Sequence, residues 1–293
     1  MEHIKIVLDW FPNTNHTGIL LAKKRGWFEK EGLDVEIEGK VHGSMELHGA
    51  DLICGPEISM LDCMERGIGL TGVATFTQKC DSGIVSLKEA GITRPRELMG
   101  KRLSHWSPAW YHKAIGRIVE ADGGDYEKVI KVEKDVGDIV GTLGNGIDAT
   151  WVYENWENYE LLEAGKEINY FNLGDVDPIF DFCAPAMAAT HEVLQERPEV
   201  IRTFLRLIDE GYQDAAAHPE ETALEVKEFM PPTATDHMLR ESQKHLAPIF
   251  LDERGHWGTI RPERWDRMAD FILACGVTTS RKEREFSNEY LPQ

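Results

Sequence analysis

Basic charge, paired cysteines and long apolar runs are all scarce in this chain of 293 residues. Only 32 lysines and arginines stand against 51 aspartates and glutamates, which gives a formal net charge of −19. A surface of this sign repels nucleic acid and anionic lipid, so neither is expected as a partner. The cysteines are scattered without CxxC spacing, which argues against a disulfide framework and a zinc knuckle. They are Cys54, Cys63, Cys80, Cys183 and Cys275.

Membrane spans and familiar catalytic motifs are also missing. No segment approaches the roughly 18 consecutive apolar residues of a membrane helix. The start, "MEHIKIVLDW", lacks a signal-peptide pattern. We therefore expect a cytoplasmic protein if Met1 is the native start, and a periplasmic or cell-surface protein if a leader has been removed. The sequence has no G-x-S-x-G, HExxH or P-loop motif, so we predict no catalytic set, no metal site and no cofactor.

Strand and helix signals alternate through the first half of the chain. Apolar runs of strand length are separated by helix-length amphipathic segments, which predicts an α/β fold with parallel-rich sheets. The expected strands are 4–8, 34–38, 52–54, 70–74, 84–87, 101–106, 129–132 and 149–153. The expected helices are 18–31, 56–67, 110–122 and 136–143.

The pattern changes near residues 186–189, and from His191 onward it is almost entirely helical. This helical part has no strands with which to build a sheet, so it must pack on a sheet formed earlier. The simplest arrangement is a discontinuous lobe one, residues 1–84 and 187–293, with an inserted lobe two, residues 85–186. Two such lobes joined by two crossing strands form a clamshell whose cleft lies at the carboxyl ends of the strands.

The first polar group follows the first expected strand directly, in "LDWFPNTNH". Asp9, Trp10, Asn13 and His16 lie in this loop, at the carboxyl end of the strand. That edge of an open parallel sheet is where ligands bind, so we expect these side chains to contact a ligand. The structural alternative is that Asp9 caps the following helix and Trp10 fills the core.

Two further groups lie at strand ends in lobe two. Tyr153, Trp156 and Glu157 occupy a strand-to-helix junction in "TWVYENWENYE", and Trp106 lies in "SHWSPAWYH". A flat heteroaromatic ligand needs a stacking ring and a carboxylate that accepts its amino hydrogens, and the junction supplies both. The alternative is an amphipathic helix start with solvated acids. Together the groups predict an interlobe pocket for a small, flat, polar ring.

The opening "LDWFPNTNHTGILLAKKRGWFEKEGLDVEI" resembles that of the thiamine-pyrimidine synthases of fungi. It is also similar to their bacterial relatives, the substrate-binding proteins of ABC transporters for precursors such as formylaminopyrimidine. The resemblance extends nearly end to end, through "DATWVYENWE" and the closing "FSNEYLP". It implies a type II periplasmic-binding-protein clamshell with the helical C-terminal part on lobe one. It also implies a pyrimidine clamped by aromatics and held by carboxylates, at Asp9 and Trp10 and at Tyr153 and Glu157.

The sequence also departs from the synthases. Those enzymes use a lysine that holds pyridoxal phosphate and a histidine that is consumed, and the matching positions here are Gly55 and Ser59. Of their cysteine-rich iron motif only Cys183 is retained. These departures favour a binding protein for an aminopyrimidine, acting in transport or salvage with an ABC permease as a possible partner. The resemblance to such binding proteins implies a monomer. The alternatives are a cytoplasmic enzyme of thiamine-pyrimidine biosynthesis, with His16, His105 or His112 as acid or base, and a ligand sensor.

Overall fold

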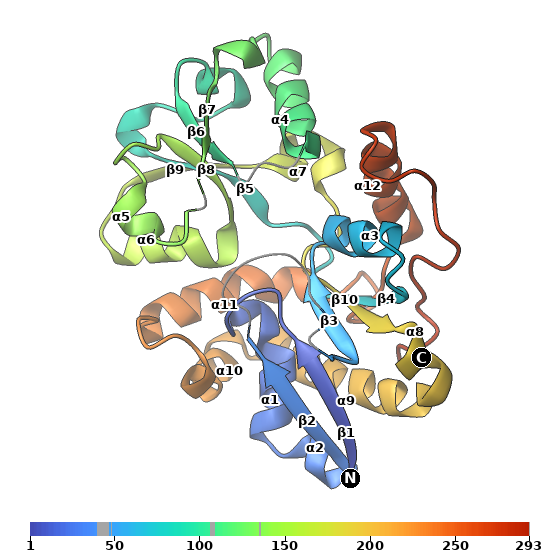
Figure 1. The fold of residues 1–293 in the computed structure, drawn as a ribbon. Coiled ribbons are helices and arrows are strands. Elements are labelled where there is room, and N and C mark those ends of the chain that lie inside the picture. The colour runs from blue at the N-terminus through green and yellow to red at the C-terminus, as the bar shows by residue number, and fades with distance from the viewer. Residues whose placement is uncertain (40–46, 48, 106–108, 135, 293) are drawn as a thin grey trace. The chain divides into compact units, whose positions relative to one another are not determined.

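The computed structural model describes residues 1–39, 47, 49–105, 109–134 and 136–292. Within them the chain forms two compact units, each with its own sheet and helices (Figure 1). Unit 1 comprises Met1–Cys80, Phe182–Leu273 and Thr278–Gln293, and unit 2 comprises Asp81–Asp181 and Ala274–Val277. The expected lobe boundaries, 1–84 and 187–293 for lobe one and 85–186 for lobe two, stay a prediction.

Unit 1 is built on a mixed sheet with the strand order β2-β1-β3-β10-β4. β1 pairs in parallel with β2 and β3, whereas β10, the returning strand, is antiparallel to β3 and β4. The antiparallel pairing brings the start of β10 to the edge at which β4 ends. The strands are β1 (Glu2–Val7), β2 (Leu33–Glu38), β3 (Leu52–Gly55), β4 (Leu70–Thr75) and β10 (Ala186–Thr190).

Helices follow β1 and β3 and make up most of the chain after β10. The helix expected over residues 18–31 is two helices, because Gly26 adopts a φ of 66° that ends the first one. The helical pattern expected after residue 191 is confirmed. The helices of this part are α1 (Thr17–Lys24), α2 (Trp27–Lys30), α3 (Glu57–Glu65), α8 (His191–Glu196), α9 (Pro198–Ala217), α10 (Pro219–Glu225), α11 (Asp236–Phe250) and α12 (Pro262–Ala274), with 3-10 turns η1 (Thr14–His16) and η7 (Lys227–Phe229).

Helices α1 and α9 contact each other backbone to backbone. A Cβ atom on Gly211 would lie 2.3 Å from the carbonyl oxygen of Gly18. A Cβ atom on Gly18 would lie 2.3 Å from the ring of Tyr212. Only glycine permits so close an approach. The contact therefore fixes α1, and the loop that precedes it, against α9.

A buried arginine on α12 anchors the two segments through which the chain leaves and re-enters unit 1. Arg264, which is 2% exposed, donates to the carbonyl oxygens of Thr77 at 2.6 Å and Phe182 at 2.8 Å. Glu57 supports the second segment, because its amide donates to Cys183 O at 2.8 Å and its carboxyl accepts from Cys183 N–H at 3.0 Å. Burial raises the pKa of Glu57 well above its usual range, because it disfavours the charged form.

Unit 2 has a second mixed sheet, with the order β7-β6-β8-β5-β9. β6 is parallel to β7 and β8, and β5 is antiparallel to β8 and β9. The strands are β5 (Ser82–Leu87), β6 (Arg102–His105), β7 (Ile130–Glu133), β8 (Ala149–Tyr153) and β9 (Ile168–Asn172). The helices are α4 (Ala109–Ala121), α5 (Ile139–Thr142), α6 (Tyr159–Glu163) and α7 (Leu173–Val176), with the π-helical turn η5 (Glu154–Asn158) and 3-10 turns η2 (Lys88–Ala90), η3 (Pro95–Leu98), η4 (Tyr126–Lys128) and η6 (Pro178–Phe180).

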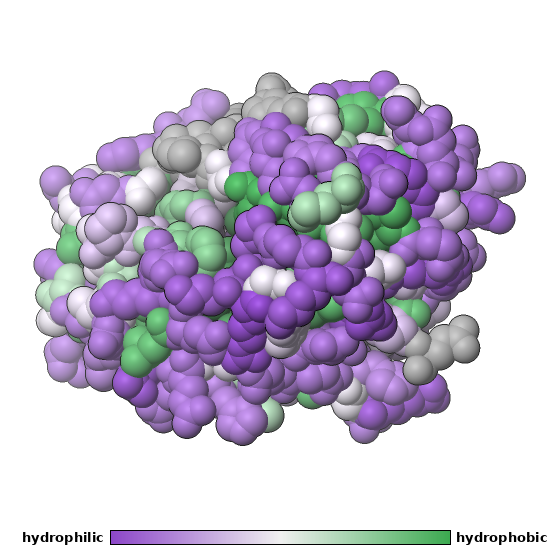
Figure 2. All heavy atoms as spheres, turned by 90° about the horizontal axis from the view of Figure 1, so that it is seen from below, coloured by the Kyte–Doolittle hydropathy of each residue, from purple (hydrophilic) through white to green (hydrophobic). Residues whose placement is uncertain are grey.

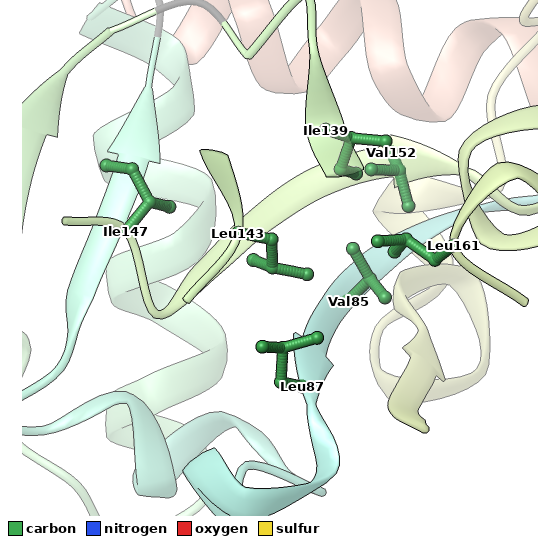
Figure 3. Close-up of a cluster of buried hydrophobic side chains, with 7 residues drawn as sticks. All are labelled: Val85, Leu87, Ile139, Leu143, Ile147, Val152 and Leu161. Atoms are coloured by element: carbon green, nitrogen blue, oxygen red, sulfur yellow. The ribbon is translucent and has the colours of Figure 1, made fainter. Parts of the chain in front are cut away.

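One apolar core of unit 2 lies between its sheet and the short helices that follow β7 and β8. Side chains from β5, β8, α5 and α6 point toward one another in Figure 3. Burying such residues contributes about 1.5–3 kcal/mol for each large aliphatic side chain. The cluster consists of Val85, Leu87, Ile139, Leu143, Ile147, Val152 and Leu161.

The sequence analysis missed strand β9. All of its residues are partly buried, and β9 lies at the edge of the sheet. An edge strand of this kind needs no continuous apolar run, and "INYFN" has none. β9 is recognisable only through its pairing with β5, which the local sequence does not show.

Polar residues predominate on the face of the molecule in Figure 2, with apolar residues scattered between them. The exposed large apolar side chains of the described residues are far apart in the sequence: Met1, Ile130, Leu162 and Val176. Single apolar residues of this kind are normal on protein surfaces. None of the helices in the described ranges combines the length and apolar character that a membrane crossing requires.

The α1–α9 contact predicts a large effect of one added methyl group. Gly211→Ala should lower the free energy of unfolding by about 3 kcal/mol, because the Gly18 backbone cannot move aside. Gly116→Ala is the control, since its Cβ would lie 3.2 Å from the Tyr126 ring edge, which can shift. Urea unfolding should show a change below about 1 kcal/mol for that control. Equal effects of the two substitutions would contradict this account of the contact.

Candidate functional site

In unit 1 the candidate site begins where β1 ends. Asp9 and Trp10 follow the strand directly; the Asp9 side chain is 19% exposed, and Trp10 is partly buried with its ring 5.5 Å from that of Phe11. Asp9 is not the helix cap. Asn13 has that role, since its side-chain oxygen accepts from Asn15 N–H at 2.9 Å at the start of η1. Asp9 thus keeps its carboxylate at the sheet edge.

His16 brings this loop together. The ring is fully buried, with Nε2 at 2.8 Å from Asp9 Oδ1 and Nδ1 accepting from Asn13 N–H at 3.2 Å. Asp9, Asn13 and His16, which the sequence grouped, therefore form one hydrogen-bonded chain. Asp9 Oδ2 makes no hydrogen bond within the described part of the protein.

Residues that the sequence analysis did not single out also surround this loop. Cys54 lies near Asp9. Burial raises the pKa of the Cys54 thiol, and the negative charge of Asp9 raises it further. Phe76 meets the His16 ring edge-on at 5.8 Å, and Tyr212 donates to Asn15 O at 2.7 Å. Cys54 and Phe76 could have been found by looking at strand ends, because Cys54 is the second-last residue of β3 and Phe76 follows β4 directly. Tyr212 lies inside α9 and has no local signal.

In unit 2 the corresponding feature is the end of β8. Tyr153 is the last strand residue, and the chain continues into the π-helical turn η5 rather than a regular helix. Single π-turns occur frequently at functional sites. Tyr153 and Glu157 are partly buried, whereas Trp156 is only 3% exposed and offers little of its indole to a ligand.

The Glu157 carboxyl is held against the end of β8, with Oε2 accepting from Tyr153 N–H at 3.2 Å. Burial raises the pKa of Glu157 to about 8, and the carboxyl groups of Glu160 and Asp81 add to the rise. A group with this pKa is mostly protonated at neutral pH. The sequence analysis expected a carboxylate here, or in the alternative a solvated acid, and the structure indicates a neutral carboxylic acid.

Asp81 organises the same edge. Its Oδ2 accepts from Asn155 N–H at 3.1 Å, and its carbonyl oxygen accepts from Glu154 N–H at 3.0 Å. Asp81 precedes β5, and Ser82 pairs with Tyr153 in the antiparallel register. The sequence analysis looked for ligand contacts at the carboxyl ends of strands and therefore did not find Asp81. Because β5 is antiparallel to β8, the amino end of β5 lies beside the carboxyl end of β8.

The third expected group is only partly visible. Trp106 lies outside the described residues. His105 and His112 have ring centroids 4.5 Å apart, and His112 Nδ1 lies 2.7 Å from the Tyr126 hydroxyl. Burial lowers the pKa of His112, and the neighbouring His105 and Lys131 lower it further. Among the described residues, no cluster of three or more His, Cys, Asp or Glu side chains could hold a metal ion.

Two surface hollows of unit 1 lie away from these strand ends. One, of about 280 Å³, contains Arg202, whose guanidinium stacks 4.9 Å from the Tyr290 ring. The other, of about 290 Å³, contains Arg197, which is paired with Asp51. Because these charged groups are already paired within the protein, we do not regard either hollow as the ligand site.

Comparison with solved structures identifies the fold. The periplasmic aliphatic sulphonate binding protein SsuA from Escherichia coli aligns with a TM-score of 0.74 at 14% identity, covering 97% of this chain and 91% of that one. The desulfurization enzyme DszB aligns with a TM-score of 0.67 at 13% identity, covering 99% and 97%. The predicted periplasmic-binding-protein fold is thus confirmed, and this fold carries both binding proteins and an enzyme.

Sequence relatives extend over nearly the whole chain. The formylaminopyrimidine-binding protein of Halalkalibacterium halodurans is 25% identical, covering 94% of this chain and 86% of its own length. The 4-amino-5-hydroxymethyl-2-methylpyrimidine phosphate synthase of Candida albicans is also 25% identical, covering 98% and 88%. The family model described as NMT1/THI5 like matches residues 13–222. The chain therefore belongs to the NMT1/THI5 like family.

Proposed function

We propose that the protein binds a small aminopyrimidine of the thiamine-precursor type, such as formylaminopyrimidine. A ligand-binding role is supported by the binding-protein fold and by a formylaminopyrimidine-binding relative. The observation that carries the choice of ligand is the Glu157 carboxyl, which is held by Tyr153 N–H and kept protonated by burial.

A protonated carboxyl matches one edge of an aminopyrimidine. Its hydroxyl donates and its carbonyl oxygen accepts, side by side. A 4-aminopyrimidine offers a ring nitrogen that accepts and an amino group that donates, in the same spacing. Glu157 can therefore make two parallel hydrogen bonds to this edge, and Tyr153, which precedes the π-turn and is partly buried, can supply a stacking ring.

Unit 1 supplies complementary chemistry. Asp9 accepts from His16 through Oδ1, and its Oδ2 remains for an N–H donor of the ligand. Trp10 is partly buried beside it and can supply a further stacking ring. A pyrimidine without an amino group would leave a desolvated carboxyl unpaired, which costs about 1–3 kcal/mol. Amino groups are therefore the feature that this site selects.

The residues at two positions, one at the end of β3 and one in α3, favour binding over synthesis. Gly55 ends β3 and Ser59 lies in the first turns of α3. They stand where the resemblance places the lysine and histidine of the synthases, and neither supplies an amine or an imidazole. We propose that the bound pyrimidine is released unchanged, in transport or salvage, as a monomeric receptor would deliver it to an ABC permease. A synthase relative of equal identity makes an enzyme the second candidate.

Isothermal titration with formylaminopyrimidine, hydroxymethylpyrimidine, its phosphate, pyridoxal phosphate and a pyrimidine lacking the amino group tests this proposal. Glu157→Gln should retain affinity within about threefold, because an amide also presents a donor beside an acceptor. Glu157→Ala and Asp9→Ala should each lose about tenfold or more. Glu89→Gln, an exposed substitution in unit 2, is the control.

Each outcome separates the candidates. Saturable binding of an unphosphorylated aminopyrimidine that is recovered unchanged supports a receptor. Binding of pyridoxal phosphate alone, or recovery of an altered pyrimidine, supports the enzyme instead. Equal affinity for the pyrimidine without an amino group would rule out the proposed role of the two carboxyl groups.

Glu157 also predicts a pH dependence of stability. Its pKa rises from 4.5 to about 8 on folding, so between these values the folded protein holds a proton that the unfolded chain releases. The free energy of unfolding should therefore fall as the pH rises from 5 to 8 through this group. Urea unfolding should show that Glu157→Gln becomes more stable relative to wild type at pH 8 than at pH 5. The same difference at both pH values would contradict the raised pKa, and Glu89→Gln again serves as the control.

A further inference from the structure

The imidazole of His16 occupies an unusual place for a ligand contact. It is fully buried, and each ring nitrogen already has a partner inside the first loop. We infer that His16 is a positioning residue that holds the Asp9 carboxylate in one orientation, and does not itself touch the ligand. This inference rests on the proposed function in assigning the Asp9 carboxylate to ligand binding.

The hydrogen bonds determine where the ring carries its proton. Nδ1 lies 3.2 Å from the Asn13 amide, which can only donate, so Nδ1 must accept and carries no proton. The proton therefore lies on Nε2, which donates to Asp9 Oδ1 at 2.8 Å. A backbone amide thus selects the tautomer, and the tautomer selects the orientation of the carboxylate.

The ring has no room to turn. Phe76 meets it edge-on, with centroids 5.8 Å apart and an interplanar angle of 84°. Phe76 is itself fixed by Tyr212 and Trp257, which stack on each other at 4.4 Å and both meet Phe76 edge-on. A 180° rotation about the Cβ–Cγ bond would place Cδ2 where Nδ1 lies and Cε1 where Nε2 lies, and both hydrogen bonds of the ring would be lost.

The loop is fastened from α11, more than two hundred residues later in the chain. Thr14 and Ser242 are joined by a hydroxyl–hydroxyl hydrogen bond of 2.6 Å. The Thr17 hydroxyl donates to Gln243 Oε1, also at 2.6 Å. Both threonines are buried, and they flank His16 in the sequence. These two hydrogen bonds tie the segment around His16 to α11.

The consequence is a carboxylate that is oriented before the ligand arrives. With Oδ1 occupied by His16, Asp9 presents Oδ2 in a single direction. Orienting the group in advance removes part of the ordering cost of binding. The affinity gain from His16 should therefore depend entirely on Asp9.

Nitrogen-15 NMR of the ligand-free protein tests the tautomer directly. The expected spectrum shows His16 with a proton on Nε2 and none on Nδ1, and a His16 signal that changes in Asp9→Asn. The exposed residue His3 is the internal reference. A proton on Nδ1, or a His16 signal that is insensitive to Asp9→Asn, would overturn the inference.

A double-mutant cycle tests the effect on binding. His16→Gln keeps an N–H donor toward Asp9 and should bind aminopyrimidine nearly as well as wild type. His16→Leu should lose about tenfold in affinity in the presence of Asp9 and less than about twofold in the Asp9→Asn background. Equal losses in both backgrounds would show that His16 acts by itself, as a ligand contact or as packing.

The two readouts distinguish the possible failures. If wild type binds no aminopyrimidine, the proposed function fails, and the NMR tautomer still decides whether His16 orients Asp9. If the ligand binds but the cycle shows no coupling, the positioning role fails alone. If His16→Leu does not fold, His16→Gln and the NMR measurement remain decisive.

Discussion

The backbone contact between α1 and α9 is the constraint on which the candidate site of unit 1 depends. Gly18 and Gly211 lie so close that neither can carry a Cβ atom. Because α1 is fixed in this way, the loop between β1 and α1 can span only a short path along the sheet edge. A hydrogen bond between Asn15 and α9 then holds the loop on that path. Hydrogen bonds that join Thr14 and Thr17 to α11 support it further. The helical C-terminal part thereby shapes a loop at the start of the chain.

The two units use carboxyl groups in opposite ways. Asp9 is partly exposed and accepts from a buried imidazole, whereas Glu157 is protonated because burial disfavours its charge. The first suits a donor of the ligand, and the second suits a donor and an acceptor together. A ring with an amino group beside a ring nitrogen offers the matching pattern, which is the basis of the proposed function.

Much of the fold was predictable because apolar runs and helical periodicity are local. β1 and the loop with Asp9 followed from the sequence alone, as did the end of β8 at Tyr153. Asp81 was not predictable, since its position at the edge depends on the antiparallel pairing of β5. Tyr212 reaches the loop only through packing of α9, and the protonation of Glu157 depends on its burial. What the sequence could not supply is therefore the set of contacts between distant segments.

The most direct test is a crystal structure of the protein with formylaminopyrimidine bound. The account predicts that the pyrimidine ring stacks on Tyr153. Glu157 should lie within hydrogen-bond distance of both the amino group and the adjacent ring nitrogen, and Asp9 Oδ2 should accept from a second N–H of the ligand. A ligand bound away from both carboxyl groups would contradict the account.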